Sequence, residues 1–207
     1  MPAHFEMPPD EARALLAGVR AADLVTVSDQ GLVATFLPLL YDPDRHVLLG
    51  HVARNNAHWR AAGGDVESLV ILPGPDDYVS PTWYATKREH GRVVPTWNYT
   101  TLHVYGRLVA HDDVEWLRAL VTRLTDHHEA TLAEPWHVAD APDRYIEGQL
   151  RAIVGLEFVI TRVEAKAKLS QNRSTEDRTG VVAGLEEVGT HPALALADQM
   201  RPGLSVD

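Results

Sequence analysis

Hydrophobic and polar positions alternate with a period of two along most of this chain, which is typical of short β-strands. Turn-forming residues separate these segments, beginning with the hairpin signal Ser28-Asp29-Gln30-Gly31. Strand-like stretches lie at 24–27, 33–40, 47–52, 68–72 and 156–166. The run Pro73-Gly74-Pro75 is expected to end the fourth of them. The pattern predicts a mainly β fold of about six antiparallel strands.

The alternation is clearest from Pro95 onward, where the two faces of one strand differ in character. One face is aliphatic, with Leu102, Val104, Leu108 and Ala110. The other face is aromatic and polar, with Trp97, Tyr99, Thr101, His103, Tyr105 and Arg107. An isolated barrel would leave the second face exposed, so we expect a homodimer that covers it.

Helical periodicity appears before, between and after the strand-like stretches. Pro9 opens a helix that runs to about residue 19, and Asp112 with Glu115 forms a capping box. That capping box starts a helical insert over about 112–153, and two further helices follow over about 174–201. We therefore expect one domain, 1–207, with helices added to a β-barrel.

Bulk composition narrows the class of protein. No apolar run approaches the length of a membrane span, and the first residues lack the basic and apolar regions of a signal peptide. The chain has no cysteine, which excludes disulfides, thiolate metal sites and iron–sulfur clusters. A cytoplasmic protein without membrane contact is expected.

The net charge of −10 bears on nucleic-acid binding. Binding to DNA depends on neutralising phosphates, and the basic residues here are scattered rather than clustered. We expect no direct contact with nucleic acid.

Residues 78–106 are rich in large aromatic side chains and contain two Pro-Thr-Trp triplets that end at Trp83 and Trp97. Aromatic faces bordered by small hydroxyls suit a planar ligand. Trp83, Trp97 and Tyr99 are therefore candidate cofactor-binding residues, although an ordinary barrel core explains them as well.

Two segments carry groups suited to an anion. In residues 51–59 a strand runs into a helix, where Arg54 and free amides favour phosphate or carboxylate. His58 follows Arg54 by four residues and shares its helical face if the helix begins early. In residues 168–173, Lys168, Ser170 and Gln171 could hold a phosphate or propionate. A surface ion pair and a solvated loop are the plainer interpretations.

Taken in order, several blocks resemble the PaiB family, often described as FMN-binding negative transcriptional regulators. They are PAHF (2–5), TFLPL (35–39), GHVARN (50–55), VSPTWY (79–84), VPTWNY (94–99), HVYG (103–106), IVG (153–155) and KLSQN (168–172). The resemblance implies an FMN-binding split barrel, homodimeric, with its cofactor between subunits. Arg54 then matches the position where split-barrel flavoproteins hold the FMN phosphate, and Asn55 beside it is a further candidate cofactor-binding residue.

The resemblance extends to a haem branch, the piperazate synthases, which bind haem b and close an N–N bond in N5-hydroxy-L-ornithine. His58 matches the iron ligand in that branch, and His51 and His103 are the fallback ligands. Lys87 or His103 is the candidate base. Haem b and FMN both stay open, since Asn56-Ala57 departs from many relatives. The alternatives to the haem enzyme are an FMN-binding regulator without turnover and an FMN-dependent oxidoreductase.

Overall fold

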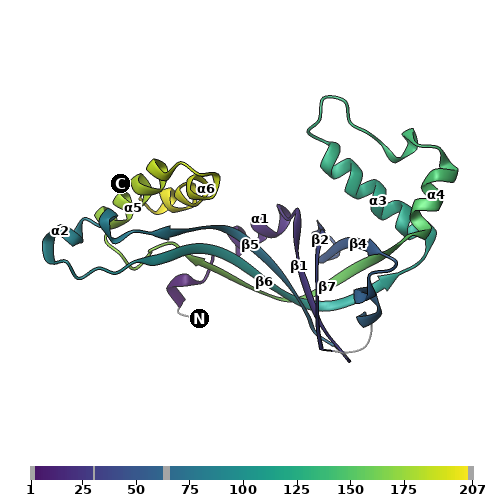
Figure 1. Cartoon of the computed structure of the whole chain (residues 1–207), viewed down its shortest axis with the longest axis horizontal. Coiled ribbons are helices and arrows are strands. Elements are labelled where there is room, and N and C mark those ends of the chain that lie inside the picture. Colours follow the sequence, from purple (N-terminus) through teal and green to yellow (C-terminus); the bar gives the residue numbers. More distant parts are fainter. Residues whose placement is uncertain (1–2, 30, 63–65, 205–207) are drawn as a thin grey trace. The chain divides into compact units, whose positions relative to one another are not determined.

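The structure is a computed structural model that describes residues 3–29, 31–62 and 66–204. Its centre is a seven-stranded sheet in the order β2-β1-β5-β6-β7-β4-β3 (Figure 1). The strands are β1 (Ala21–Ser28), β2 (Gly31–Pro38), β3 (Leu40–Asp42), β4 (Val47–Ala53), β5 (Ser68–Val79), β6 (Thr96–His111) and β7 (Ile153–Lys168). The pairs β1–β2, β1–β5, β3–β4 and β4–β7 are antiparallel. The mainly β, antiparallel prediction is confirmed with one strand more than expected.

The helices lie before, between and after the strands. They are α1 (Pro9–Ala17), α2 (Thr86–His90), α3 (Val114–Glu129), α4 (Asp143–Arg151), α5 (Thr175–Val188) and α6 (His191–Met200). Short 3-10 helices include η2 (Ala57–Ala61) and η3 (Pro81–Trp83). Over the described residues, no helix has the length and apolar character needed to span a bilayer.

Strand β5 differs from its prediction, because it continues through Pro73-Gly74-Pro75 to Val79. A side chain at Gly74 would place its Cβ only 2.0 Å from Thr100 Oγ1. Glycine therefore allows the strand to lie against its neighbour, and proline interrupts a strand only where its missing N–H is needed. The expectation that this run ends the strand was wrong.

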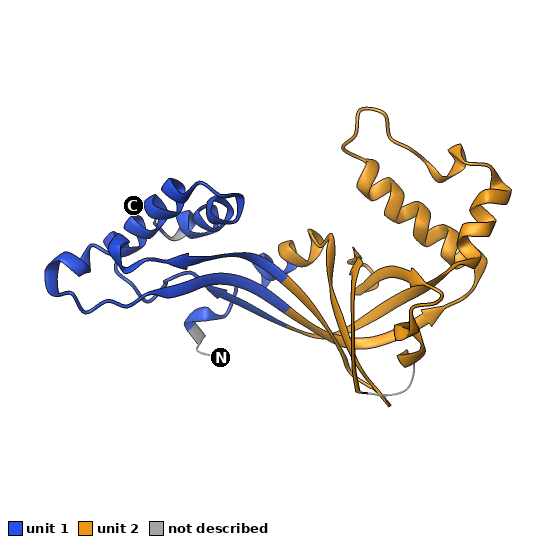
Figure 2. Ribbon diagram, in the orientation of Figure 1, with its two compact units in different colours: residues 1–13, 73–102, 164–207 blue, residues 14–72, 103–163 orange. Residues whose placement is uncertain are grey.

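The chain divides into two compact units (Figure 2). Unit 1 comprises residues 1–13, 73–102 and 164–207, and unit 2 comprises 14–72 and 103–163. Strands β5, β6 and β7 contribute residues to both.

In unit 1, helix α5 packs closely on η3. A Cβ at Gly184 would lie 2.3 Å from Trp83 Cδ2, and one at Gly180 would lie 2.0 Å from the Trp83 carbonyl oxygen. Buried Asp177 accepts hydrogen bonds from both the amide and the hydroxyl of Thr86, at 2.9 and 2.8 Å. These contacts attach the start of α2 and the Trp83 ring to the C-terminal helices.

In unit 2, helix α3 covers one face of β4, where Val47 and Leu49 pack against Leu120 and Leu124. The N-cap of α3 is Asp113, whose carboxylate accepts from the Trp116 amide at 2.8 Å. The capping box predicted at Asp112 was therefore one residue early.

The predicted alternation along β6 is confirmed. Its aliphatic face is buried at Leu102, Val104 and Leu108, each at most 4% exposed, while Ala110 near the end of the strand is exposed. On the opposite face the Lys166 ammonium lies 5.1 Å from the Tyr99 ring centre, and the Arg162 guanidinium lies 3.6 Å from that of Tyr105. Cations therefore cover part of the aromatic-polar face.

Candidate functional site

The step from β4 into η2 carries several of the predicted site residues. β4 ends at Ala53, and Asn56 is the N-cap of η2, accepting a hydrogen bond from the His58 amide at 2.9 Å. Arg54 and Asn55 thus lie in the turn before the helix, with Asn55 exposed. Arg54 and His58 were expected to share a helical face only if the helix began early, and this condition is not met because η2 begins after Arg54.

The Arg54 guanidinium is engaged within the chain. It forms a two-pronged ion pair with Asp112 and donates to the carbonyl oxygens of Arg151 and Ile153 at 2.7 and 2.9 Å. Hydrogen bonding to Asp112 raises the pKa of Arg54, and hydrogen bonding to Arg54 lowers the pKa of Asp112. These contacts neutralise the charge and tie the turn to the start of β7, so they favour a structural role over phosphate binding.

His58 is fully buried and both of its ring nitrogens have partners. Nδ1 lies 2.8 Å from Thr35 Oγ1, and Nε2 lies 2.9 Å from Thr26 Oγ1. Thr26 Oγ1 continues to Ser68 Oγ at 2.8 Å. We call Thr35, His58, Thr26 and Ser68 the His58 network. It fastens η2 to β1, β2 and β5, and it leaves no imidazole nitrogen free for iron.

His51 differs from His58 in its hydrogen bonding. It is half-buried on β4, and its Nδ1 is a buried atom without a hydrogen-bond partner among the described residues. Gly155 lies directly across the ladder, where an added Cβ would lie 2.1 Å from the Trp116 ring. His51 therefore occupies the sheet face that also carries Trp116. Burial lowers the pKa of His51, which keeps its imidazole neutral.

The turn after β7 gathers the second group of predicted residues. Lys168 Nζ donates to Thr96 Oγ1 at 2.5 Å and to the Trp97 carbonyl oxygen at 2.9 Å. Gln171 closes the turn, accepting from the Leu169 amide and donating to the Ala167 carbonyl oxygen. The Gln171 side chain is thus used locally, which leaves Lys168 as the stronger ligand candidate.

The three aromatic candidates do not share one environment. Trp83 is half-buried against α5, as described above. Trp97 is 49% exposed, and its Nε1 donates to Asp76 at 2.8 Å. Tyr99 is half-buried beneath Lys166. Packing on helix α5 explains the position of Trp83, and the ligand-binding roles of Trp83, Trp97 and Tyr99 stay predictions.

The two candidate bases lie in different units. Lys87 is exposed on α2 in unit 1, and His103 is half-buried on the aromatic-polar face of β6 in unit 2.

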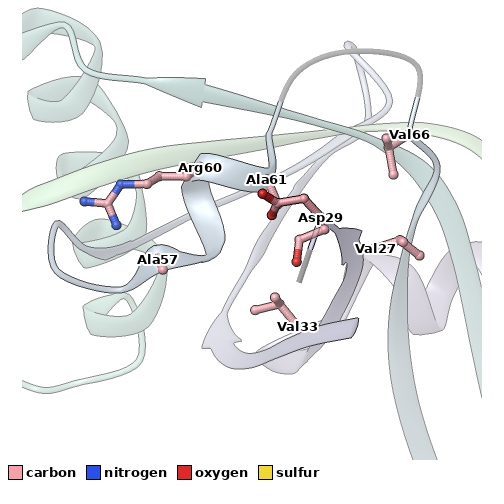
Figure 3. Close-up of a pocket in the computed structure, with 8 residues that line it drawn as sticks. Val27, Asp29, Val33, Ala57, Arg60, Ala61 and Val66 are labelled. Atoms are coloured by element: carbon pink, nitrogen blue, oxygen red, sulfur yellow. The ribbon is translucent and has the colours of Figure 1, made fainter. Parts of the chain in front are cut away.

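Unit 2 also contains a cavity of ≈ 660 Å³ between η2 and the β1–β2 hairpin (Figure 3). Among the described residues its lining is mainly apolar, and Asp29 and Arg60 are the charged ones. Figure 3 shows the Arg60 side chain pointing away from the others, and its guanidinium lies 4.9 Å from the Trp59 ring centre. The described residues contain no group of three or more potential metal ligands.

Comparison with known proteins identifies the family. Residues 1–162 match the family described as "Putative FMN-binding domain". This chain belongs to that family. It is 32% identical over 183 residues to "Protease synthase and sporulation protein PAI 2" of Bacillus subtilis, covering 87% of this chain and 86% of the relative. The PaiB resemblance is confirmed.

Two solved structures show the same fold. Rv2991 from Mycobacterium tuberculosis is similar at a TM-score of 0.59 and 11% identity, covering 84% of this chain and 93% of the other. The "FAD and Heme binding protein from Mycobacterium smegmatis" is similar at a TM-score of 0.54 and 18% identity, covering 83% of this chain and 77% of the other. The fold is the FMN-binding split barrel, as the resemblance implied.

Sequence reasoning missed the partners of His58. Thr26 and Leu24 share the buried face of β1, so the alternation already marked Thr26 as an inward hydroxyl that needs a partner. No sequence signal connects it to His58, because their contact depends on how η2 folds over the hairpin.

Proposed function

We propose that this protein binds haem b and that His51, rather than His58, is the iron ligand. The observation that carries the proposal is the buried Nδ1 of His51, which has no hydrogen-bond partner among the described residues. Leaving such an atom unpaired costs about 1–3 kcal/mol, a cost that a ligand at this imidazole would offset. His58 does not fit the same role, because threonine hydroxyls occupy both of its nitrogens.

Two further observations support haem at this histidine. Iron is bound by neutral imidazole, and burial lowers the pKa of His51, which favours that form. The Mycobacterium smegmatis protein of the same fold is described as a FAD and haem binding protein, so this split-barrel architecture suits haem in at least that protein.

We propose further that the chemistry is N–N bond formation in N5-hydroxy-L-ornithine, on the resemblance to piperazate synthases. Bound haem would supply a Lewis acid for the hydroxylamine oxygen. The α-amine nitrogen attacks N5, the N5–O bond breaks, and hydroxide leaves with a proton as water, so no external oxidant is needed. Lys87 and His103 are the candidates to accept the amine proton, and His103 faces the polar side of β6.

Mass spectrometry tests the reaction. The haem-loaded protein is expected to convert N5-hydroxy-L-ornithine into a cyclic product lighter by one water, and His51→Ala is expected to give none. Unchanged substrate with the fully loaded protein would contradict the N–N assignment while leaving haem binding intact.

FMN is the second candidate cofactor, because the family itself is described as a putative FMN-binding domain. In that case the protein is an FMN-binding regulator or an FMN-dependent oxidoreductase, and His51 has no ligating role. Flavin absorption in the purified protein would favour this alternative.

We also propose a homodimer, supported by an apolar stripe on the edge strand β2. Leu32 is 75% exposed and Phe36 is 69% exposed, and Val27, directly opposite Leu32 on β1, is 54% exposed. Exposed apolar side chains on a sheet edge are typical of an interface.

Phe36→Asp is expected to convert the dimer to a monomer, because a charge would be buried in an apolar contact. Light scattering at micromolar concentration measures the mass. Val188→Asp, which replaces an exposed valine on α5, is the matched control. A monomeric wild-type protein would contradict the proposal.

A further inference from the structure

A small cavity of ≈ 120 Å³ lies in unit 1 beside the turn that follows β7. Its polar lining comes from Tyr84, Thr96, Lys168, Ser170, Asn172 and Arg173, and no acidic residue among those that the structure describes lines it. The volume is well below the roughly 300–1,000 Å³ of pockets that enclose drug-sized ligands, so it suits a small group.

Tyr84 is the unusual member of this lining. The residue is 2% exposed, and its hydroxyl is buried without a hydrogen-bond partner among the described residues. Buried tyrosine hydroxyls normally have a partner, and an unpaired one is costly. A bound acceptor in the cavity would give this donor a partner.

Two cations line the same cavity. Lys168 Nζ uses two hydrogen bonds on Thr96 and Trp97, and the ammonium has a further N–H to donate. The Arg173 guanidinium lies 4.8 Å from the Tyr84 ring centre. Neither cation has an acidic partner among the described residues. The site therefore combines two positive charges with an unpaired hydroxyl donor.

The turn that presents these groups is held in place before any ligand binds. Ser170 adopts a left-handed backbone, with φ of 60°, which is uncommon for a residue other than glycine. Its hydroxyl accepts a hydrogen bond from Nδ2 of the buried Asn98 at 3.1 Å and lies at donor distance from Oδ1 of the same side chain, also 3.1 Å. Ser170 thus acts as an anchor of the turn, and a site held rigidly in advance loses little entropy on binding.

We propose that this cavity is a binding site for a small oxyanion, a phosphate or carboxylate group, held by Lys168, Arg173 and the Tyr84 hydroxyl. The proposal does not depend on haem or on His51, which lies in unit 2. The anion has two possible sources: a free anion or the phosphate end of a larger ligand such as FMN.

Calorimetric titration of the purified full chain with inorganic phosphate, at constant ionic strength, tests the site. Arg173→Gln is expected to abolish the binding, because it removes one of two charges. Tyr84→Phe is expected to weaken it roughly tenfold, the value of one hydrogen bond to a charged group. The same Tyr84→Phe change is expected not to lower the melting temperature of the phosphate-free protein, since only an unpaired hydroxyl is lost.

Arg88→Gln is the matched control, since Arg88 is exposed on α2 and does not line the cavity. It is expected to bind phosphate like the wild type. Wild-type protein that binds no phosphate, or Arg173→Gln protein that binds it equally well, would overturn the site.

Competition distinguishes the two sources. If FMN displaces phosphate and riboflavin does not, the site holds the phosphate of a larger ligand; if neither displaces it, the site takes a free anion. Displacement by riboflavin as effective as by FMN would contradict the proposal, because riboflavin lacks the anionic group. Haem binding, followed separately by its Soret band, is expected to be unchanged in Arg173→Gln.

Discussion

Replacing His51 with alanine is expected to reduce haem affinity by a hundredfold or more, on the order of the loss caused by disrupting a metal site. The reason is that Nδ1 of His51 has no hydrogen-bond partner among the described residues, whereas both ring nitrogens of His58 are paired. Equilibrium titration followed by Soret absorbance measures the affinity. Added free imidazole is expected to restore a ligated spectrum, because it replaces the missing side chain.

His127→Ala provides the matched control for the His51 variant. His127 is exposed on α3, so its removal deletes an imidazole without changing the core. Its haem affinity is expected to equal that of the wild type. A His51→Ala protein that binds haem as tightly as this control would remove His51 from the proposal.

Replacing His58 with alanine is expected to act on stability instead. The change empties a fully buried site and leaves the hydroxyls of Thr26 and Thr35 without their imidazole partner. Cavity formation and the lost hydrogen bonds together are expected to lower the free energy of unfolding by about 3 kcal/mol. Urea denaturation measures this value, and His127→Ala is expected to stay within about 0.5 kcal/mol of the wild type. A His58→Ala protein as stable as the wild type would show that the His58 network contributes nothing.

The His58 network also predicts a pH dependence. Burial lowers the pKa of His58 below its ordinary value of 6.5, so the folded protein holds the neutral ring while the unfolded chain takes up a proton. Its contribution to stability is therefore complete above pH 6.5 and is lost as the pH falls through the lowered pKa. Between about pH 7.5 and about pH 5.5 the wild type is expected to lose more stability than His58→Ala. His51 shifts in the same direction and remains in the variant, so part of the loss persists.

Alternation along the chain was sufficient to predict the sheet, because buried and exposed faces differ wherever one face meets the core. The prediction failed at Pro73-Gly74-Pro75, where the residue types favour a turn but the strand continues through them in the folded chain. The close approach of Gly74 to Thr100 joins residues distant in sequence, and no local rule reports such a contact.

The candidate site also depends on contacts between residues that are distant in sequence. The motif that runs from His51 to Trp59 correctly marked a strand-to-helix step, but the roles within it depend on partners elsewhere in the chain. Asp112 forms an ion pair with the Arg54 guanidinium, and the hydroxyls of Thr26 and Thr35 form hydrogen bonds with the His58 ring. In the part of the chain that the structure describes, Nδ1 of His51 has no hydrogen-bond partner, and only the folded structure distinguishes His51 from His58 in this respect.

The optical spectrum of the wild-type protein during titration with haem is the most direct test of the central claim. We predict a Soret band that rises to saturation at one haem per chain and whose position reports a histidine ligand. The spectrum of the same preparation before haem is added is expected to lack flavin bands. Twin flavin bands in the purified protein, together with no saturable Soret band on adding haem, would contradict the account.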